Sequence, residues 1–361
     1  MYSLKTETVE RLLQWYRLNR RDLPWRRDKD PYGIWLSEIM LQQTRVEAVI
    51  EYYERFRKQY PDVSSLAEAD DKTLLRLWEG LGYYSRVRNM KKSAQVLMEQ
   101  YDGKLPQDPK ELQKLPGIGS YTAGAIAAIA FGLPAAAVDG NVFRVLTRYF
   151  GIRKDIADPK LKKELEQIIT DFYKENGISD PDDISDLTQS LMELGALVCL
   201  PNGRPLCETC PFSAECMAHK EDLTGIIPVR SGNKERKVID RTVFVIRDPD
   251  RFLLHRRPAK GLLAGMYEFP GIDQKLNETE AVDHLEKLGI KVGSLKPLPS
   301  ARHVFTHLEW QMQAYEANID KLPDMDQEEY VSADRDRLKS LAIPSAFRVY
   351  LDHYGLREVK K

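Results

Sequence analysis

The sequence predicts two domains of different class, an all-α domain followed by an α+β domain. The chain has 361 residues, which is long for one domain and suits two. Apolar positions recur at helical spacing through most of the first 200 residues. From residue 242 the pattern changes to short strand-like runs, at 242–246, 252–254 and 311–316. We therefore expect an all-α domain over 1–221, a linker over 222–238 and an α+β domain over 239–361.

Composition excludes several classes of protein. Hydrophobic residues form 42% of the chain, which supports folded cores. No run approaches the roughly twenty apolar residues of a membrane span, and the first residues lack the apolar core of a signal peptide. We expect a soluble cytoplasmic monomer with no membrane partner. The formal net charge is -1, so a nucleic-acid surface would come from local basic clusters, such as those within 17–27 and 86–92.

The positions of histidine and cysteine limit the available chemistry. All six histidines lie at or after His219, so catalysis in the first 200 residues would use carboxylates, tyrosine, lysine or water. All four cysteines lie within residues 199–216, separated by seven, two and five residues. Such a compact group is not the pattern of a disulfide framework. It suits a structural zinc ion or a cubane iron–sulfur cluster, and the spacing alone does not choose between them.

A glycine-containing hairpin at residues 115–124, Leu-Pro-Gly-Ile-Gly-Ser-Tyr-Thr-Ala-Gly, lies between two helical patterns. Gly117 and Gly119 allow positive φ and leave no Cβ over the turn, so backbone N–H groups can converge on a phosphate at the next helix. Such a contact binds DNA without reading its sequence. An ordinary turn between helices would have the same glycines. Asp139 precedes a helical pattern over 141–150, where it is either a simple N-cap or a functional anion near the helix dipole.

Residues 115–124 and 138–144 together resemble the helix-hairpin-helix DNA glycosylase superfamily. Members that resemble endonuclease III carry a lysine where this chain has Tyr121, and that lysine forms a Schiff base with the sugar. Because tyrosine cannot form one, the resemblance implies a monofunctional glycosylase. The stretch 37–44, Ser-Glu-Ile-Met-Leu-Gln-Gln-Thr, is similar to the motif that holds the catalytic glutamate of the MutY-type adenine DNA glycosylases, here Glu38.

Glu38 also has an ordinary interpretation, as an acidic residue in the first turn of a helix. We expect that helix to run over 35–59 with Ser37 as its cap. The resemblance implies instead that Glu38 is the general acid and that Asp139 stabilises the sugar cation. It places Tyr121 and Asn141 beside them, where they would orient these groups.

The resemblance implies three further groups of residues. The DNA and the lesion would be contacted by Gln43, which wedges into the duplex, and by Thr44, Leu81, Tyr83, Arg86, Gly117 and Gly119. The flipped adenine would lie near Trp25, Arg26, Gln189 and Glu193, although a surface pair on one helix face would explain the last two equally well. A [4Fe-4S] cluster would be held by Cys199, Cys207, Cys210 and Cys216, in a loop one residue longer than the family's first gap of six.

The second domain contains Gly-Met-Tyr-Glu-Phe-Pro-Gly at 265–271, which resembles the start of a Nudix fold. A working Nudix hydrolase follows it with an Arg-Glu-x-x-Glu-Glu-x-Gly helix, whose carboxylates hold magnesium. Ending that pattern at Gly289 places Val282, Asp283, Glu286 and Lys287 on its Arg and three Glu positions, so the metal-binding set is broken. We interpret the domain as a binding module, like the one with which MutY-type enzymes recognise 8-oxoguanine. Their Phe-Ser-His loop corresponds here to Phe305, Thr306 and His307.

The resemblance covers nearly the whole chain. It implies a six-helix module over about 27–135 with the helix-hairpin-helix at 109–131, a cluster module from 1–26 and 136–221, and a Nudix-like domain over 239–361. It implies base excision repair of double-stranded DNA, in which adenine opposite 8-oxoguanine or guanine is flipped out and hydrolysed from its sugar, in a bacterial-type cytoplasm at the nucleoid. Three alternatives stay open: an endonuclease III-like lyase, a Nudix pyrophosphohydrolase and a non-catalytic DNA-binding protein.

Overall fold

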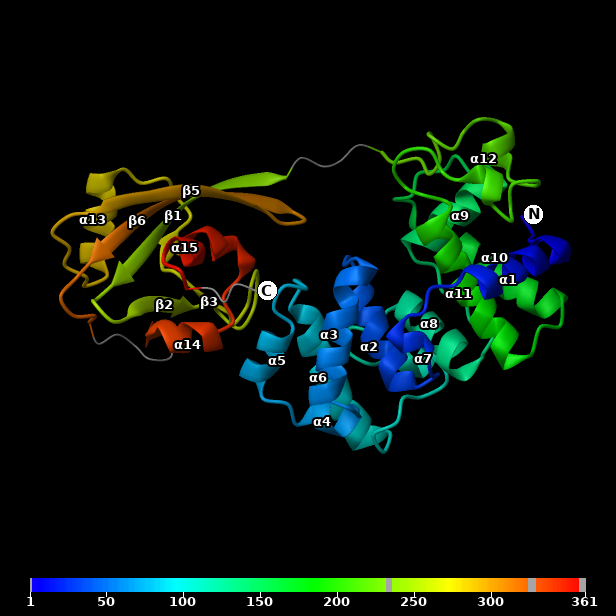
Figure 1. Cartoon of the computed structure of the whole chain (residues 1–361), viewed down its shortest axis with the longest axis horizontal. Helices are drawn as coiled ribbons and strands as arrows, with labels where there is room; N and C mark the ends of the chain where they lie inside the picture. Colours follow the sequence, from blue (N-terminus) through cyan, green and yellow to red (C-terminus); the bar gives the residue numbers. More distant parts are fainter. Residues whose placement is uncertain (1, 232–235, 324–328, 357–361) are drawn as a thin grey trace. The chain divides into compact units, whose positions relative to one another are not determined.

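The computed structural model describes residues 2–231, 236–323 and 329–356 (Figure 1). The chain divides into two compact units, Met1–Ala69 with Ser85–Asn233 and Asp70–Tyr84 with Lys234–Lys361. The first unit is helical, and the second is built on a β-sheet with short helices. The predicted order, an all-α region followed by an α+β region, is confirmed. Among the described residues, none of the helices combines the length and the apolar character that a membrane span requires.

Four helices of the first unit begin at an aspartate followed by a proline. In α2, α7, α10 and α11 the aspartate side chain accepts a backbone N–H of the first turn, and the proline stands where an N–H would have no partner. The helices of this unit are α1 (Thr6–Asn19), η1 (Pro24–Arg26), α2 (Pro31–Leu41), α3 (Val46–Gln59), α4 (Val63–Ala67), α6 (Ser85–Gln100), α7 (Pro109–Leu112), α8 (Ser120–Phe131), α9 (Gly140–Phe150), α10 (Pro159–Glu175), α11 (Pro181–Leu197), η2 (Cys207–Thr209) and α12 (Met217–Lys220).

The prediction of one helix over 35–59, capped by Ser37, is wrong. Helix α2 begins at Pro31 because the Asp30 carboxylate accepts the first-turn N–H groups, and Ser37 lies inside it with its hydroxyl donating to the Ile34 carbonyl at 2.9 Å. The helix ends at Leu41, and α3 starts only at Val46. Glu38 is therefore in the middle of a buried helix and not in an exposed first turn.

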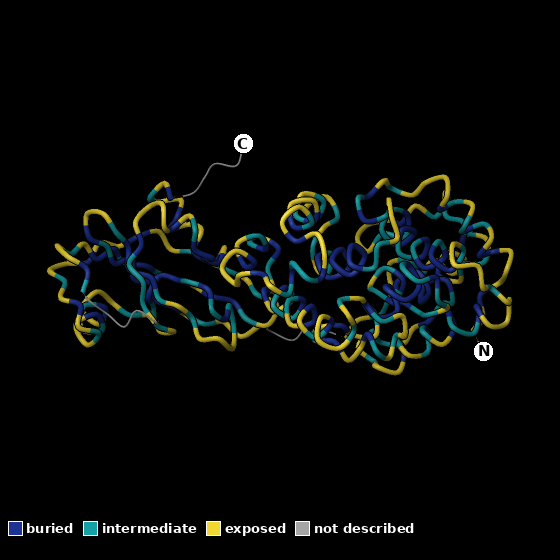
Figure 2. The backbone as a smooth tube through the Cα atoms, turned by 90° about the horizontal axis from the view of Figure 1, so that it is seen from below, coloured by how far each residue is buried: buried dark blue, intermediate teal, exposed yellow. Residues whose placement is uncertain are grey.

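Helix α8 lies at the centre of the first unit and is apolar on every side, with residues 122–129 buried. It packs against α2 and α11. A Cβ on Gly124 would lie 2.0 Å from the carbonyl oxygen of Ala136, so only glycine allows the segment before Asp139 to cross this helix so closely. Figure 2 shows the buried segments of both units in dark blue.

Part of the expected linker is fixed to the first unit. Arg148 donates to the carbonyl oxygens of Thr224 and Ile227 at 2.7 and 2.8 Å. The Ile156 N–H donates to the Val229 carbonyl at 3.0 Å. Residues 232–235 of the expected linker lie outside the described residues, and strand β1 begins at Lys237, within the last two positions of that linker.

The sheet of the second unit has the strand order β3-β2-β1-β6-β5, with β4 paired to β1 and β7 to β2. Strands β1 and β6 are parallel, from Lys237 opposite Leu308 to Arg247 opposite Asn318, and the other pairs are antiparallel. Separate apolar clusters include residues of α13 in one and of α14, η3 and α15 in the other. The strands are β1 (Lys237–Arg247), β2 (Phe252–Arg256), β3 (Tyr267–Glu268), β4 (Gly271–Ile272), β5 (Lys296–Val304), β6 (Leu308–Asn318) and β7 (Tyr330–Ala333). The helices are α5 (Asp71–Leu77), α13 (Glu278–Lys287), α14 (Arg335–Ser340), η3 (Ser345–Phe347) and α15 (Arg348–His353).

Candidate active site

One cavity of the first unit, with a volume of about 1170 Å³, collects ten of the residues that the sequence singled out. They come from helices α2, α8, α9 and α11 and from the segments beside them. A cavity of this size exceeds the usual range for small-molecule sites, which suits part of a larger substrate. The ten residues are Trp25, Arg26, Glu38, Gln43, Thr44, Tyr121, Asp139, Asn141, Gln189 and Glu193.

Glu38 is 6% exposed and accepts a hydrogen bond from the Tyr121 hydroxyl on its Oε2 atom. Burial raises the pKa of Glu38 to about 7, and the nearby charge of Asp139 adds to this rise. The hydrogen bond from Tyr121 and the charge of Arg26 oppose it only in part. The carboxyl group therefore exchanges a proton close to neutral pH, which is what a general acid requires.

Asp139 is the N-cap of α9, as the simpler interpretation of the sequence predicted. Its Oδ1 atom accepts the Val142 N–H at 2.7 Å, and its Oδ2 atom accepts the Asn141 side-chain amide at 2.8 Å. Burial raises the pKa of Asp139, whereas these hydrogen bonds stabilise the charged form and lower it. The cap does not exclude the functional interpretation, because this carboxylate lines the same cavity as Glu38.

The side chain of Asn141 is fixed by Arg144, which the sequence interpretation missed. Arg144 donates to the Asn141 side-chain oxygen and to the Gly195 carbonyl, both at 2.8 Å, and to the Cys199 carbonyl at 2.7 Å. A Cβ on Gly195 would lie 2.5 Å from the Cβ of Asn141, so glycine is required where α11 meets α9. The only signal in the sequence was the spacing of three residues between Asn141 and Arg144, which places them on one helix face.

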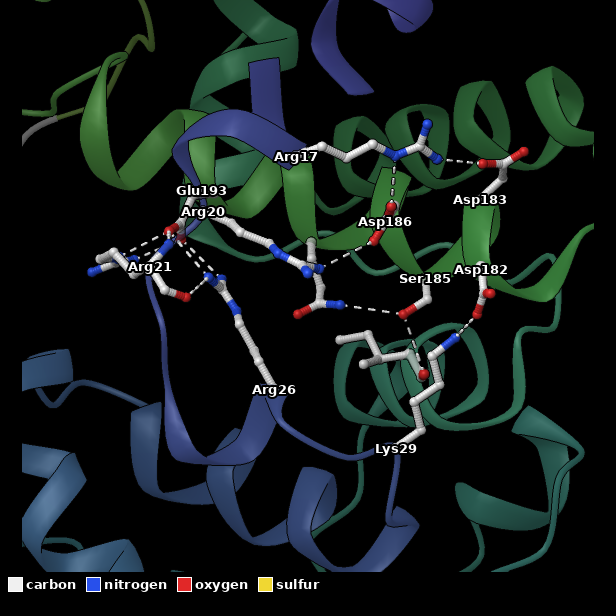
Figure 3. A network of polar contacts seen from close by, with 12 residues as sticks. Arg17, Arg20, Arg21, Arg26, Lys29, Asp182, Asp183, Ser185, Asp186 and Glu193 are labelled. Carbon is white, nitrogen blue, oxygen red and sulfur yellow. Dashed lines mark hydrogen bonds and ion pairs between the residues drawn. The ribbon is translucent and has the colours of Figure 1, made fainter. Parts of the chain in front are cut away.

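Glu193, unlike Glu38, is bound directly by positively charged side chains (Figure 3). Its side chain is 1% exposed and is bound by the guanidinium groups of Arg21 and Arg26, at 2.8 and 2.9 Å. Burial alone would raise the pKa of Glu193, but the hydrogen bonds from both arginines outweigh it and bring the pKa to about 2. The alternative of a surface pair is therefore wrong for Glu193. Gln189 is half-buried, and its amide donates to the Ser185 hydroxyl at 3.2 Å.

The four cysteines line a second cavity of the first unit, and none of them forms a disulfide. Arg148 donates to the sulfur of Cys199 at 3.3 Å. Within the described part of the chain, no three His, Cys, Asp or Glu side chains are placed to hold a single metal ion. Four thiols around one cavity are the donor set that either an iron–sulfur cluster or a structural zinc ion uses.

The hairpin glycines differ from one another. Gly117 has a φ of +81°, and a Cβ there would lie 2.8 Å from the Cβ of Asn89, so both conformation and space require glycine. The expectation of a positive φ at Gly119 is wrong, because its φ is −90° and it serves as the N-cap of α8. A Cβ on Gly119 would meet no atom within 4 Å, so the start of α8 is open at this point.

The remaining predicted contact residues do not line the cavity. Leu81 is buried, whereas Tyr83 is exposed with a φ of +46°. The Tyr83 hydroxyl hydrogen-bonds to that of Thr306, which belongs to the same unit. Phe305 packs its ring against Trp310, with 4.9 Å between centroids, and His307 is exposed. Arg86 faces the end of helix α2.

Two known protein families match different parts of the chain. Residues 36–171 match the family described as "HhH-GPD superfamily base excision DNA repair protein", and residues 242–353 match "NUDIX domain". The adenine DNA glycosylase of Mus musculus is 33% identical over 97% of this chain and 79% of its own length. The chain belongs to the adenine DNA glycosylases. The resemblance found in the motifs is confirmed, and the protein is a DNA N-glycosylase of base excision repair.

Two further comparisons support this assignment. The adenine DNA glycosylase of Buchnera aphidicola subsp. Schizaphis graminum is 34% identical over 82% of this chain and 83% of its own length. The structure of a thermostable thymine-DNA glycosylase superposes with a TM-score of 0.52 and 29% identity, over 59% of this chain and 95% of that one. The helical unit thus has the fold of a known DNA glycosylase.

Proposed function

We propose that this enzyme removes adenine opposite 8-oxoguanine or guanine from double-stranded DNA, by flipping the base out and hydrolysing its bond to the sugar without cutting the strand. The observation that carries the proposal is the pair of carboxyl groups in one cavity, Glu38 with a pKa of about 7 and Asp139 held by Asn141. Glycoside hydrolysis needs one group that protonates the leaving group and another that stabilises the sugar cation.

The reaction then follows from these two groups. Glu38 donates its proton to N7 of adenine, and the bond between N9 and C1′ breaks with its electron pair leaving on the base. Asp139 stabilises the positive charge that forms on the sugar. The Glu38 carboxylate next takes a proton from water, whose oxygen bonds to C1′, and this restores the protonated acid. Tyr121 keeps its proton because burial raises the pKa of its hydroxyl, so it acts as a hydrogen-bond donor to Glu38.

The rest of the cavity supports recognition of an extruded adenine. Trp25 is buried with its ring 5.4 Å from that of Tyr53, and it lines the cavity together with Arg26, Gln189 and Glu193. We assign these four residues to the adenine pocket. We assign Gln43 to the wedge beside the extruded nucleotide and Thr44 to the neighbourhood of the opposite base. We assign Leu81, Tyr83, Gly117 and Gly119 to contacts with the DNA and the lesion.

The second unit supplies recognition of the opposite base in this proposal. Thr306 is exposed, follows the packed ring of Phe305 and precedes the exposed His307. Its hydroxyl can donate to or accept from a purine edge. We assign these three residues to recognition of 8-oxoguanine. Lys287 stands where the Nudix pattern has a metal-binding carboxylate, and we therefore interpret this domain as a binding module and not a hydrolase.

We also propose that Cys199, Cys207, Cys210 and Cys216 hold a [4Fe-4S] cluster. When bound, the cluster supplies a structural crosslink within the loop of residues 199–216. Arg148 connects this loop to α9, because it donates to the sulfur of Cys199 and to the Leu200 carbonyl at 2.9 Å. Analysis of iron, sulfide and zinc in the purified protein decides between the two metals: about four irons per chain support the cluster, and one zinc per chain would refute it.

The deciding experiment is single-turnover release of base from duplexes with adenine opposite 8-oxoguanine, guanine or thymine. We expect release that is fastest opposite 8-oxoguanine and that falls roughly 100-fold or more in Asp139→Asn. Borohydride is added in parallel: a trapped covalent complex with the intact enzyme would favour a lyase instead. Wild-type protein that binds mismatched DNA but releases no base would leave only a DNA-binding function.

A further inference from the structure

Arg86 of helix α6 is directed at the C-terminal end of helix α2. Its Nη1 atom donates to the carbonyl oxygens of Ile39, Met40 and Gln42, at 2.7, 3.2 and 2.6 Å. The last carbonyl groups of a helix have no partner within the helix and carry the negative end of its dipole. A guanidinium group at this place satisfies them and fixes how the chain leaves the helix.

The segment that leaves α2 has an unusual conformation. Gln43 follows the last of these carbonyl groups and has a φ of +60°, a left-handed conformation that is rare outside glycine. Its side chain is exposed, and it lines the same cavity as Glu38. Strained residues of this kind persist only where the surrounding structure holds them, and they concentrate at functional sites.

We propose that Arg86 is a positioning residue for Gln43, so that it acts in extruding the adenine and not in cleaving its bond. This rests on the proposed function, in which Gln43 wedges into the duplex. The guanidinium group fixes the turn over residues 42–44, and a fixed turn presents the wedge in one orientation before DNA binds. The contacts of Arg86 with carbonyl groups of its own chain thus replace the DNA contact that the sequence suggested.

Lysine is a partial substitute at this position. Its ammonium group keeps the charge opposite the helix end, but it is a compact point charge and not a planar fork. Arg86→Lys should therefore retain part of the effect, whereas Arg86→Ala should lose it. Lys104, an exposed cation in the turn after α6, serves as the control for loss of one positive charge, as Lys104→Ala.

Two measurements on the 361-residue chain separate extrusion from cleavage. The first is the single-turnover rate of adenine release opposite guanine. The second is the fluorescence of 2-aminopurine placed at the adenine position, measured in a Glu38→Gln background so that no bond is cut. We expect Arg86→Ala to lower the rate about tenfold or more, with a matching loss of fluorescence amplitude. Arg86→Lys should give a rate and an amplitude between those of the wild type and Arg86→Ala. Lys104→Ala should leave both the rate and the amplitude unchanged.

A double variant completes the test. If Arg86 acts through the wedge, Gln43→Ala combined with Arg86→Ala will be no slower than the slower single variant. A rate loss with unchanged fluorescence, or effects of the two substitutions that multiply, would overturn the proposal, since Arg86 would then act on Glu38 or independently. If Arg86→Ala fails to fold by circular dichroism, Arg86→Lys gives the same comparison. Base release absent from the wild type would refute the proposed function, while the fluorescence would still report on Arg86.

Discussion

Glu38 and Glu193 line the same cavity and are both buried, yet their pKa values are shifted in opposite directions. Glu38 accepts a hydrogen bond from the hydroxyl of Tyr121, and burial raises its pKa to about 7. Glu193 is bound by Arg21 and Arg26, and its pKa falls to about 2. Burial disfavours the charged form at both sites, so the neighbouring group decides the outcome. One glutamate is set up to move a proton, and the other is a permanent anion that orders the arginines around it.

The largest expected effect is on catalysis at the Glu38 side. Glu38→Gln keeps the shape of the side chain but removes its acidic proton, and we expect single-turnover adenine release to fall by roughly 1000-fold. Folding stability at pH 7 should not fall, because burial disfavours the charged form of Glu38 and the neutral glutamine removes that cost. Binding of the adenine-containing duplex, measured in parallel, should be retained. A variant that still releases adenine at one tenth of the wild-type rate would contradict the assignment.

The next effect is on stability, at the Glu193 side. Glu193→Gln leaves the buried ends of Arg21 and Arg26 without their counter-charge, and we expect a loss of about 3 kcal/mol in the free energy of unfolding. Thermal and urea unfolding of wild type, Glu193→Gln and Glu38→Gln measure this difference. Equal stability of the two variants would mean that the arginines find other partners and that the contrast between the two glutamates does not affect folding.

A third expectation concerns pH. In the proposed mechanism protonated Glu38 is the active form, and its pKa is about 7, so the rate of base release should be level below that pH. Above it, each pH unit should lower the rate about tenfold, because the fraction of protonated acid falls by that factor. Single-turnover rates from pH 5 to 9 test this, on a duplex whose binding is saturated throughout. A rate that rises with pH over this range would identify Glu38 as a base in the limiting step instead.

The smallest expected effect concerns Gln189, one helical turn before Glu193. Gln189→Ala removes one neutral hydrogen-bonding group from the cavity wall, which is worth about 1 kcal/mol and corresponds to a roughly fivefold slower release of adenine. The same substitution should not affect release of purine, which lacks the amino group of adenine, and should not move the pH profile. Equal slowing of both bases would place Gln189 outside the adenine pocket.

Sequence motifs located the site but misjudged one of its elements. The hairpin at 115–124 and the cap at Asp139 were recognisable because their residues are contiguous and their chemistry is local. Helix α2 was misplaced, since it is apolar on all sides and therefore has no periodicity that marks its ends. The pair Asp30 and Pro31 at its start was the available signal. The left-handed conformation of Gln43 could not be predicted from its residue type, because glutamine rarely adopts it.

By itself, the sequence determined the order of the two folds, the family and many residues that line the large cavity, because short continuous motifs contain this information. Only the tertiary structure decided the charge states of those residues. Arg21 and Glu193 are 172 positions apart, and Tyr121 and Glu38 are 83 positions apart. A pKa depends on burial and on charges within a few ångströms, and these neighbours are brought together by packing of separate helices. Two glutamates on buried helices therefore look alike in the sequence and differ in the fold.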